Sequence, residues 1–317
     1  MAIEITRSGK HSLTVETPVM PAAGTLGFGD EYRKLINMDK LGAFVTNPVT
    51  YEPWSPSSGT RIVPLDAGVL VHTGLPNPGL SRVLKTYRDV WGGMPMPVIL
   101  HLVATSPEQV RKCASRLDEE ETVDAIELGL PDDLDWQDAA ALVSAATRRA
   151  EKPVLVCLPL QDAAELAETV VEAGAHALVI GAAPRGTARD PLTGKLVSGR
   201  IYGPLVKPMA LRTVGMLMRR VTEVPIIGCG GIHSPQDARD YLEAGARAVQ
   251  VDSVTWIKPR MLERIARDLG GWIVTRATGA FPDEWHPDMG DTEQEQKFGK
   301  RRPSIENPKG TSISDNS

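Results

Sequence analysis

Eight short apolar runs constrain the fold of this chain more than any other feature of its sequence. The runs are apolar throughout instead of alternating, as is typical of strands buried on both faces of a parallel sheet. Amphipathic helix patterns separate several of them, and this alternation predicts repeated βα units. The runs lie at 19–23, 43–46, 97–102, 123–128, 153–158, 177–181, 225–229 and 248–252, and the helix patterns include 107–117, 136–149, 163–172 and 235–243.

A local repeat supports the same interpretation. Residues 171–179 (VEAGAHALV) and 242–250 (LEAGARAVQ) share one pattern, in which a helix ends, a glycine follows and a strand starts almost at once. Gly174 and Gly245 are expected to form left-handed helix caps. About eight βα units fit before residue 255, which favours a (β/α)8 (TIM) barrel of the α/β class. A doubly wound open sheet is the alternative, although no G-x-G-x-x-G follows the first strand.

Two segments interrupt the repeat, and the end of the chain differs from the rest. Residues 50–80 and 182–206 are rich in proline and glycine, and long excursions of this kind in a barrel are usually active-site loops. We expect the barrel to span residues 1–280. Residues 283–317 are polar and rich in charge, which predicts a disordered C-terminal tail.

Charge and cysteine usage exclude several classes of protein. With 35 Lys+Arg against 40 Asp+Glu, the net charge is −5, which argues against a nucleic-acid binder. No apolar run approaches the roughly 20 residues that span a bilayer, and no secretory signal opens the chain. The three cysteines lie far apart without a C-x-x-C, which argues against a disulfide scaffold or a metal site. We expect a soluble, cytoplasmic protein that acts on a small molecule.

The sharpest local feature is the sequence at 227–238, where an apolar run ends in Gly230-Gly231 and a helix pattern follows. Ser234 is a natural N-cap residue and Pro235 a natural first helical residue. Glycines let backbone N–H groups approach an anion, and barrels hold phosphate in the loops after strands seven and eight. The pair therefore predicts a phosphate site, with a plain tight turn as the alternative.

Several motifs, taken in order, resemble the dihydroorotate dehydrogenases, which are FMN-dependent (β/α)8 barrels. They are PVMPAAGT (18–25), GLPN (74–77), GPLVKPMALR (203–212), GGIHSPQDA (230–238) and AGARAVQV (244–251), so the resemblance covers roughly residues 10–270. It implies FMN at the carboxyl ends of the strands, and a homodimer or an electron-transfer partner. The cofactor-binding residues implied are Ala22, Ala23, Gly24, Asn47, Gly203, Gly230, Gly231 and Ser253.

The chemistry-bearing positions of that family are changed here. The family has a lysine after its second strand and another at the end of its fifth, where this chain has Asn47 and Cys157. Neither can supply the cation that stabilises a reduced flavin. Glu127 replaces an asparagine, and its charge would repel an anionic, orotate-type substrate. Leu130 stands at the position of the proton-abstracting base. The resemblance therefore implies an FMN-dependent oxidoreductase acting on CH–CH groups of an altered substrate.

A second change falls at the phosphate end, where Asp252-Ser253 replaces the Gly-Thr of the family. A carboxylate beside a phosphate is unfavourable unless its side chain points away. At the same mouth of the barrel, on the third and fourth predicted strands, His101 and Glu127 are the candidate catalytic pair for proton transfer. The alternative is a buried pair in which each side chain only satisfies the hydrogen-bonding and charge requirements of the other. Cys157 and Cys229 are expected to be inert thiols.

Three functions remain open from the sequence. The first is the FMN-dependent oxidoreductase with an altered substrate. The second is a non-catalytic barrel homologue acting as a binding or partner subunit, because the lost residues act as a unit. The third is a flavin-free barrel in which Gly230-Gly231 binds a phosphorylated substrate and His101 and Glu127 act as acid and base.

Overall fold

Eight parallel strands form the centre of the molecule. The computed structural model describes residues 2–148 and 150–278. The strands pair in the order β3-β14-β13-β10-β9-β8-β7-β4, and the end strands are joined where the Gly42 N–H donates to the Val19 carbonyl at 2.8 Å. The predicted barrel is confirmed, and the open-sheet alternative is wrong. The strands are β3 (Val19–Pro21), β4 (Phe44–Val45), β7 (Val98–Val103), β8 (Ala125–Gly129), β9 (Val154–Pro159), β10 (Ala177–Ala182), β13 (Ile226–Cys229) and β14 (Ala248–Val251).

Helices surround this barrel, and all four expected helix patterns are confirmed. Ser234 accepts a hydrogen bond from the Asp237 N–H at 3.2 Å and Pro235 opens the helix, as an N-cap and a first-turn proline should. A short 3-10 helix, η1 (Met38–Lys40), takes the place of a helix after β3. The helices are α1 (Leu80–Gly92), α2 (Pro107–Asp118), α3 (Trp136–Thr147), α4 (Ala163–Glu172), α5 (Lys207–Leu217), α6 (Pro235–Glu243), α7 (Val254–Ile257) and α8 (Arg260–Thr278).

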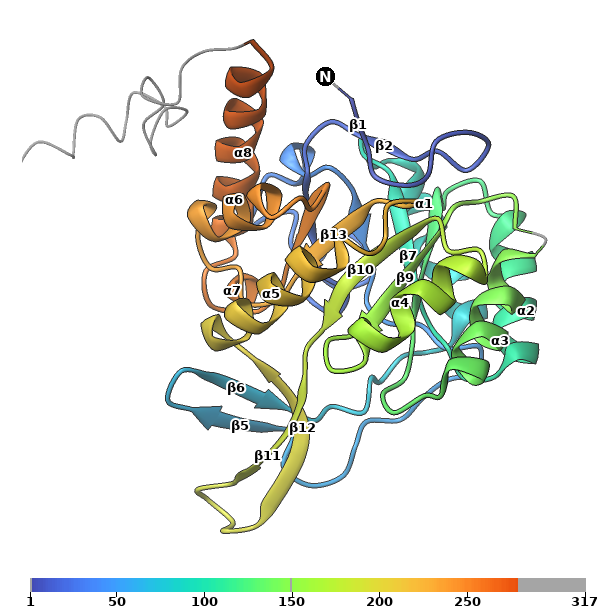
Figure 1. The fold of residues 1–317 in the computed structure, drawn as a ribbon. Coiled ribbons are helices and arrows are strands. Elements are labelled where there is room, and N and C mark those ends of the chain that lie inside the picture. Colours follow the sequence, from blue (N-terminus) through green and yellow to red (C-terminus); the bar gives the residue numbers. More distant parts are fainter. Residues whose placement is uncertain (1, 149, 279–317) are drawn as a thin grey trace, which may run out of the picture.

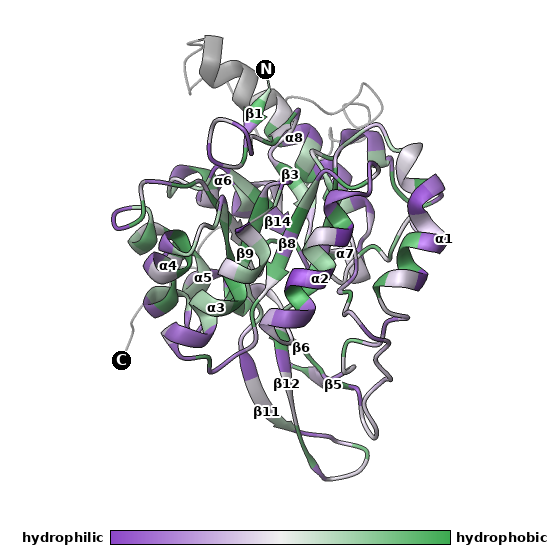
Figure 2. Cartoon of the chain, turned by 90° about the vertical axis from the view of Figure 1, so that its right-hand side faces the viewer, coloured by the Kyte–Doolittle hydropathy of each residue, from purple (hydrophilic) through white to green (hydrophobic). Residues whose placement is uncertain are grey.

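The strands bury two separate apolar layers. One layer packs between strands and helices, and includes Leu100, Val156 and Ile180. The other fills the barrel interior, and includes Ile99 and Leu155. Because successive side chains of a strand point to opposite faces, neighbouring apolar residues enter different layers. This is why the runs do not alternate in polarity, and Figure 2 shows apolar strands inside helices of mixed polarity.

A hairpin closes the amino-terminal end of the barrel, which we call the floor. Its strands are β1 (Ile3–Glu4) and β2 (Thr14–Val15), and they pair antiparallel. Ile5 and Leu13 of this hairpin are buried in the same cluster as the barrel interior. The hairpin lies at the end of the molecule opposite β5, β6, β11 and β12 (Figure 1). Apolar side chains from outside the barrel therefore seal its floor.

The two segments expected to be loops instead form a second sheet at the opposite end, which we call the mouth. The prediction missed this sheet because two local hairpins, β5–β6 and β11–β12, are joined only by the pairing of β6 with β12, about 130 residues away, as where Tyr202 pairs with Val69. The strand order is β11-β12-β6-β5, and the sheet projects from the barrel body (Figure 1). Its strands are β5 (Ile62–Leu65), β6 (Gly68–Val71), β11 (Arg185–Arg189) and β12 (Leu196–Tyr202).

Two expectations concern the chain as a whole. None of the helices within residues 2–148 and 150–278 is long and apolar enough to cross a membrane. The tail at 283–317 lies outside the described residues, so its disorder stays a prediction.

Candidate functional site

His101 and Glu127 form a buried pair at the mouth of the barrel. They sit opposite each other on the neighbouring strands β7 and β8. His101 Nδ1 lies 2.7 Å from Glu127 Oε1, and the two residues are 8% and 0% exposed. The His101 ring lies over Gly129, where an added Cβ would come within 2.5 Å of Nε2. The sequence prediction that these residues are neighbours is confirmed, while their catalytic role stays a prediction.

Gln250 extends this pair across the barrel interior. Its Nε2 donates to Glu127 Oε2 from strand β14, which is not adjacent to β8 in the sheet. Gln250 is itself buried, so both carboxylate oxygens of Glu127 have partners away from water. The sequence analysis did not single out Gln250, because a glutamine inside an apolar run carries no pattern of its own.

The positions that hold lysines in the related family have structural roles here. Asn47 Oδ1 accepts a hydrogen bond from the Gly27 N–H at 3.2 Å, which ties the end of β4 to the loop after β3. Cys157 lies in the barrel interior, where burial and the nearby charge of Glu127 raise its pKa. Burial also raises the pKa of the Cys229 thiol, with the charge of Asp252 as the second cause. Both thiols are therefore poor nucleophiles.

The end of β3 contributes small residues to the mouth. Ala22 is buried and Ala23 and Gly24 are partly exposed. The Thr25 hydroxyl donates to the Ala22 carbonyl at 2.6 Å, and Gly24 has a positive φ of 85°. This tight turn keeps side chains out of the mouth at the strand's carboxyl end.

The Gly230-Gly231 turn follows β13 and packs against the start of α5. Gly231 has φ 68°, and an added Cβ would lie 2.5 Å from the Lys207 nitrogen and 2.9 Å from the Gly203 carbonyl oxygen. Only glycine fits such a close approach of two backbone segments. Gly203, Gly230 and Gly231 therefore lie together, as the resemblance implied.

The donors of this turn face the chain's own carboxylate. The Gly231 N–H donates to Asp252 Oδ2 at 3.4 Å, and the Ser253 N–H donates to Asp252 Oδ1 at 2.6 Å. Ser253 Oγ also lies 3.1 Å from His233 Nε2. We call Gly231, Asp252 and Ser253 the anion cradle, because the N–H groups of Gly231 and Ser253 converge on the carboxylate of Asp252.

Side chains from β12 reach over the mouth, and the sequence analysis missed them. Tyr202 is partly exposed and packs edge-on against Trp256, with ring centroids 5.0 Å apart. Burial raises its pKa, and Arg200 opposes this shift. Arg200 Nη2 donates to Asp132 Oδ2 at 2.9 Å and Arg200 Nη1 donates to the Ala183 carbonyl at 2.6 Å. These residues come from a strand whose place only the folded chain reveals.

Two polar residues of the matched motifs, Lys207 and Asn77, have structural roles. Lys207 Nζ binds Asp237 Oδ1 at 2.5 Å and Asp240 Oδ2 at 2.6 Å, so it ties α5 to α6. Asn77 Oδ1 accepts hydrogen bonds from the N–H groups of Thr50 and Gly79. It therefore holds together the segment before α1.

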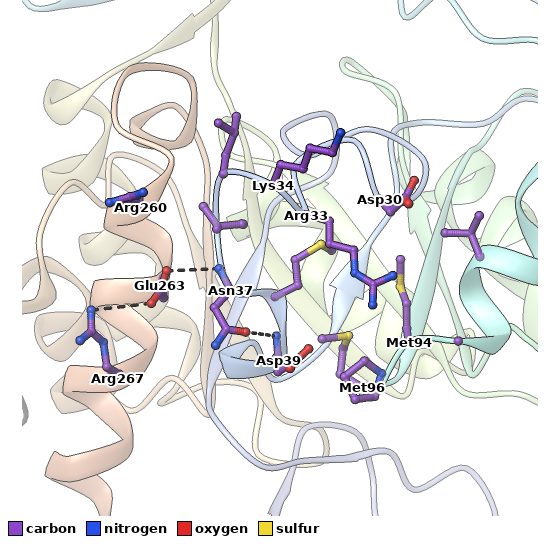
Figure 3. Close-up of a pocket in the computed structure, with 16 residues that line it drawn as sticks. Asp30, Arg33, Lys34, Asn37, Asp39, Met94, Met96, Arg260, Glu263 and Arg267 are labelled. Atoms are coloured by element: carbon purple, nitrogen blue, oxygen red, sulfur yellow. Dashed lines mark hydrogen bonds and ion pairs between the residues drawn. The ribbon is translucent and has the colours of Figure 1, made fainter.

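A separate cavity of about 610 Å³ lies away from the mouth. Its wall is formed by the segment around Arg33, the residues just before β7 and one side of α8 (Figure 3). Glu263 accepts from the Asn37 N–H at 3.2 Å and pairs with Arg267 at 3.8 Å there. None of the mouth residues named above lines it, so it is not the site that the strand ends form.

The fold is a (β/α)8 barrel, and backbone donors at its mouth converge on the carboxylate of Asp252. The family model for dihydroorotate dehydrogenase matches residues 10–272. Catalytic subunits of dihydroorotate dehydrogenase B (NAD(+)) from Trichlorobacter lovleyi and Pelobacter propionicus are both 33% identical, over 87% and 86% of this chain and 94% of each relative. The corresponding subunit from Desulforamulus reducens is 31% identical to this chain, over 84% of this chain and 93% of the length of that subunit.

The chain therefore belongs to the dihydroorotate dehydrogenase family of flavin-binding barrels, as its motifs indicated. Members of this family are oxidoreductases that act on CH–CH groups.

Proposed function

We propose that this chain is an FMN-dependent oxidoreductase that acts on a CH–CH group of a substrate other than dihydroorotate. The observation that carries the proposal is the buried pair of His101 and Glu127 at the mouth. Leu130 stands at the position of the family's base, and a leucine side chain cannot accept a proton. An imidazole beside a carboxylate can accept one. Family membership supports the flavin, and the replaced residues support the change of substrate.

The backbone donors of the anion cradle suit the anionic end of such a cofactor, but the carboxylate of Asp252 occupies them. Two backbone N–H groups already converge on a carboxylate at Asp252, which acts as a stand-in for an external anion. The phosphate end would have to displace Asp252 from the Gly231 and Ser253 N–H groups, and it would then lie beside Gly203 and His233. Ala23 and Asn47 would face the rest of the cofactor from β3 and β4.

His101 is suited to hold the proton that such an oxidation releases. Removing two hydrogens from a CH–CH group frees a proton and a hydride, and a bound flavin supplies the acceptor for the hydride. Nε2 of His101 forms no hydrogen bond within the described part of the chain, so it can take the proton. Glu127 then stabilises the imidazolium and fixes the ring orientation.

The charges at the mouth favour a substrate without a carboxylate. Arg200 and Arg185 lie 2.9 Å and 3.6 Å from Asp132 Oδ2, so their positive charges are already compensated. Asp132 Oδ1 is buried and has no hydrogen-bond partner within residues 2–148 and 150–278, so it can accept a bond from a donor group of the substrate. We expect a neutral or cationic substrate with an N–H or O–H donor.

The absorbance spectrum of the purified full chain tests this proposal. With added FMN, the protein should show the flavin bands, and a neutral CH–CH donor should bleach them while dihydroorotate should not. Bleaching by dihydroorotate would contradict the change of substrate. A colourless protein that takes up neither FMN nor riboflavin would contradict the flavin function.

A non-catalytic barrel that serves as a binding or partner subunit is the second candidate. The Asp252 carboxylate in the cradle and the Tyr202–Trp256 pair over the mouth favour it, because both occupy places that a cofactor would need. Tight flavin binding together with reduction by any physiological donor would rule it out.

The relatives are named catalytic subunits, and we propose that this chain also works with a second subunit that accepts its electrons, in the cytoplasm. Its three cysteines are free and buried, and no group of three or more His, Cys, Asp or Glu residues in the described part of the chain could hold a metal, so an iron–sulfur cluster would belong to the second subunit. Sedimentation of the purified chain distinguishes a homodimer from a monomer that awaits a different partner.

A further inference from the structure

The anion cradle is already filled by a side chain of the same molecule. Asp252 receives three protein donors, from the Gly231 N–H, the Ser253 N–H and the Ser253 hydroxyl, the last at 3.2 Å. Both carboxylate oxygens take part. The side chain thus points into the cradle and not away from it, which is the arrangement least compatible with a phosphate at the same donors.

The burial of Asp252 strengthens its repulsion of a second anion. Asp252 is 2% exposed, so water screens its charge weakly. Burial is the largest influence on its pKa and raises it, while the N–H groups of Ser253 and Gly231 and the charge of His233 act in the opposite direction. A second anion brought to the same donors would meet this group across a short, poorly screened distance.

The surroundings hold little positive charge to compensate two anions. Lys207, whose backbone packs against the Gly231 turn, is bound through its side chain to Asp237 and Asp240. Tyr241 donates its hydroxyl to the Gly230 carbonyl at 2.7 Å. Among the residues that the structure describes, no lysine or arginine side chain hydrogen-bonds to Asp252. His233 faces Ser253 and is the remaining titratable group that could offset the charge.

We propose that Asp252 is a specificity-determining residue, a built-in carboxylate that occupies the cradle and disfavours phosphomonoesters there. The identity of the excluded ligand as the phosphate end of FMN rests on the proposed function. The exclusion of phosphate itself rests only on the three donors and the burial of Asp252. The wild-type chain therefore binds riboflavin, which lacks the phosphate, at least as tightly as FMN.

Inorganic phosphate tests the cradle without any flavin. The melting temperature of the full chain is measured in phosphate and in chloride at equal ionic strength, for the wild type and for Asp252→Asn and Asp252→Gly. Phosphate should raise the melting temperature of both variants and leave the wild type unchanged. Asp190→Asn is the matched control, because Asp190 is a similarly buried carboxylate whose hydrogen-bond partners, Thr60, Leu192 and Thr193, are not cradle residues. An equal phosphate effect in the wild type, or none in either variant, overturns the proposal.

Titrations with FMN and with riboflavin then measure the selectivity. The ratio of the two dissociation constants should shift toward FMN by roughly tenfold or more in Asp252→Gly, because the like charge is gone and the space is open. An unchanged ratio overturns the role in cofactor choice. If phosphate stabilises the variants but neither flavin binds any form, the proposed function fails and the cradle inference stands. The glycine variant serves if the asparagine variant does not fold.

Discussion

The floor and the mouth of this barrel bury their residues in opposite ways. At the floor, the β1–β2 hairpin inserts Ile5 and Leu13 into the barrel interior. At the mouth, Glu127 and Asp252 are almost completely buried as carboxylates, each held by several donors. Burying apolar area stabilises a fold, whereas burying charge costs free energy unless it is paired. The floor therefore stabilises the barrel, and we propose that the mouth carries the ligand chemistry.

The largest expected effect is on turnover, at the mouth. His101→Gln should lower the rate at which a substrate bleaches bound flavin by about 10²–10⁴-fold, because it removes the proton acceptor. Flavin affinity should stay the same, since the cradle lies on other strands. Stopped-flow absorbance measures the rate. His11→Gln, on the floor hairpin, is the control and should keep the wild-type rate; a matching loss there would point to a structural cause.

Substitutions at the floor are expected to lower the free energy of unfolding. Ile5 is fully buried, so Ile5→Ala removes apolar contacts and leaves a cavity, at a cost of about 2–5 kcal/mol of unfolding free energy. Urea denaturation measures this loss. Leu192→Ala should change the stability by less than about 0.5 kcal/mol, since Leu192 is 93% exposed. Similar losses in the two variants would contradict the sealing role of the hairpin.

The floor also contains a pH-sensitive group, His176. The Val154 N–H donates to its Nδ1 at 2.9 Å, and burial, with the nearby His11 and Arg7, lowers its pKa from 6.5 to about 4. The neutral ring stabilises the fold above pH 6.5, and this stabilisation, roughly 3 kcal/mol, is lost as the pH falls toward 4. His176→Asn retains an acceptor that does not titrate.

Denaturation at pH 7 and at pH 4 measures the difference between these two proteins. The variant should lose less stability than the wild type between the two values. A control, His72→Asn, changes a partly exposed ring and should follow the wild type. Parallel losses in all three proteins would show that other groups set the acid sensitivity.

The sequence predicts the barrel well because its signals are local. Each strand is a continuous apolar run, and each helix start or end is set within a few residues, as by Ser234, Pro235 and the positive-φ glycines Gly174 and Gly245. The tight turn after β13 is likewise visible, since Gly230 and Gly231 are adjacent in sequence. Local chemistry suffices wherever the interacting groups are close along the chain.

The remainder depends on contacts between distant segments. The sheet at the mouth pairs β6 with β12, and this pairing carries Tyr202 and Arg200 over the strand ends. The Glu127–Gln250 bond crosses the interior between residues more than 120 positions apart. The direction of the Asp252 side chain depends on Gly231, from the previous βα unit. None of these has a pattern in the sequence, which explains why the site was predicted only in part.

The smallest expected effect concerns two glycines of one region, and it tests whether the mouth is rigid. Gly231→Ala should lower the stability by more than about 1 kcal/mol, because φ is 68° and the new Cβ would lie 2.5 Å from the Lys207 backbone. Gly215, in α5, has open space around an added Cβ. Gly215→Ala should therefore raise the stability by about 0.5–1 kcal/mol, since alanine favours the helix.

Thermal unfolding of the two variants gives this contrast directly. Opposite signs would show that the turn after β13 is held by close backbone packing, while the outer face of α5 is not. If Gly231→Ala is as stable as the wild type, the turn can relax away from Lys207, and the cradle donors need not stay aimed at one anion. Asp252 can exclude a phosphate only if the cradle is rigid. A soft turn could widen and hold both the carboxylate and the phosphate.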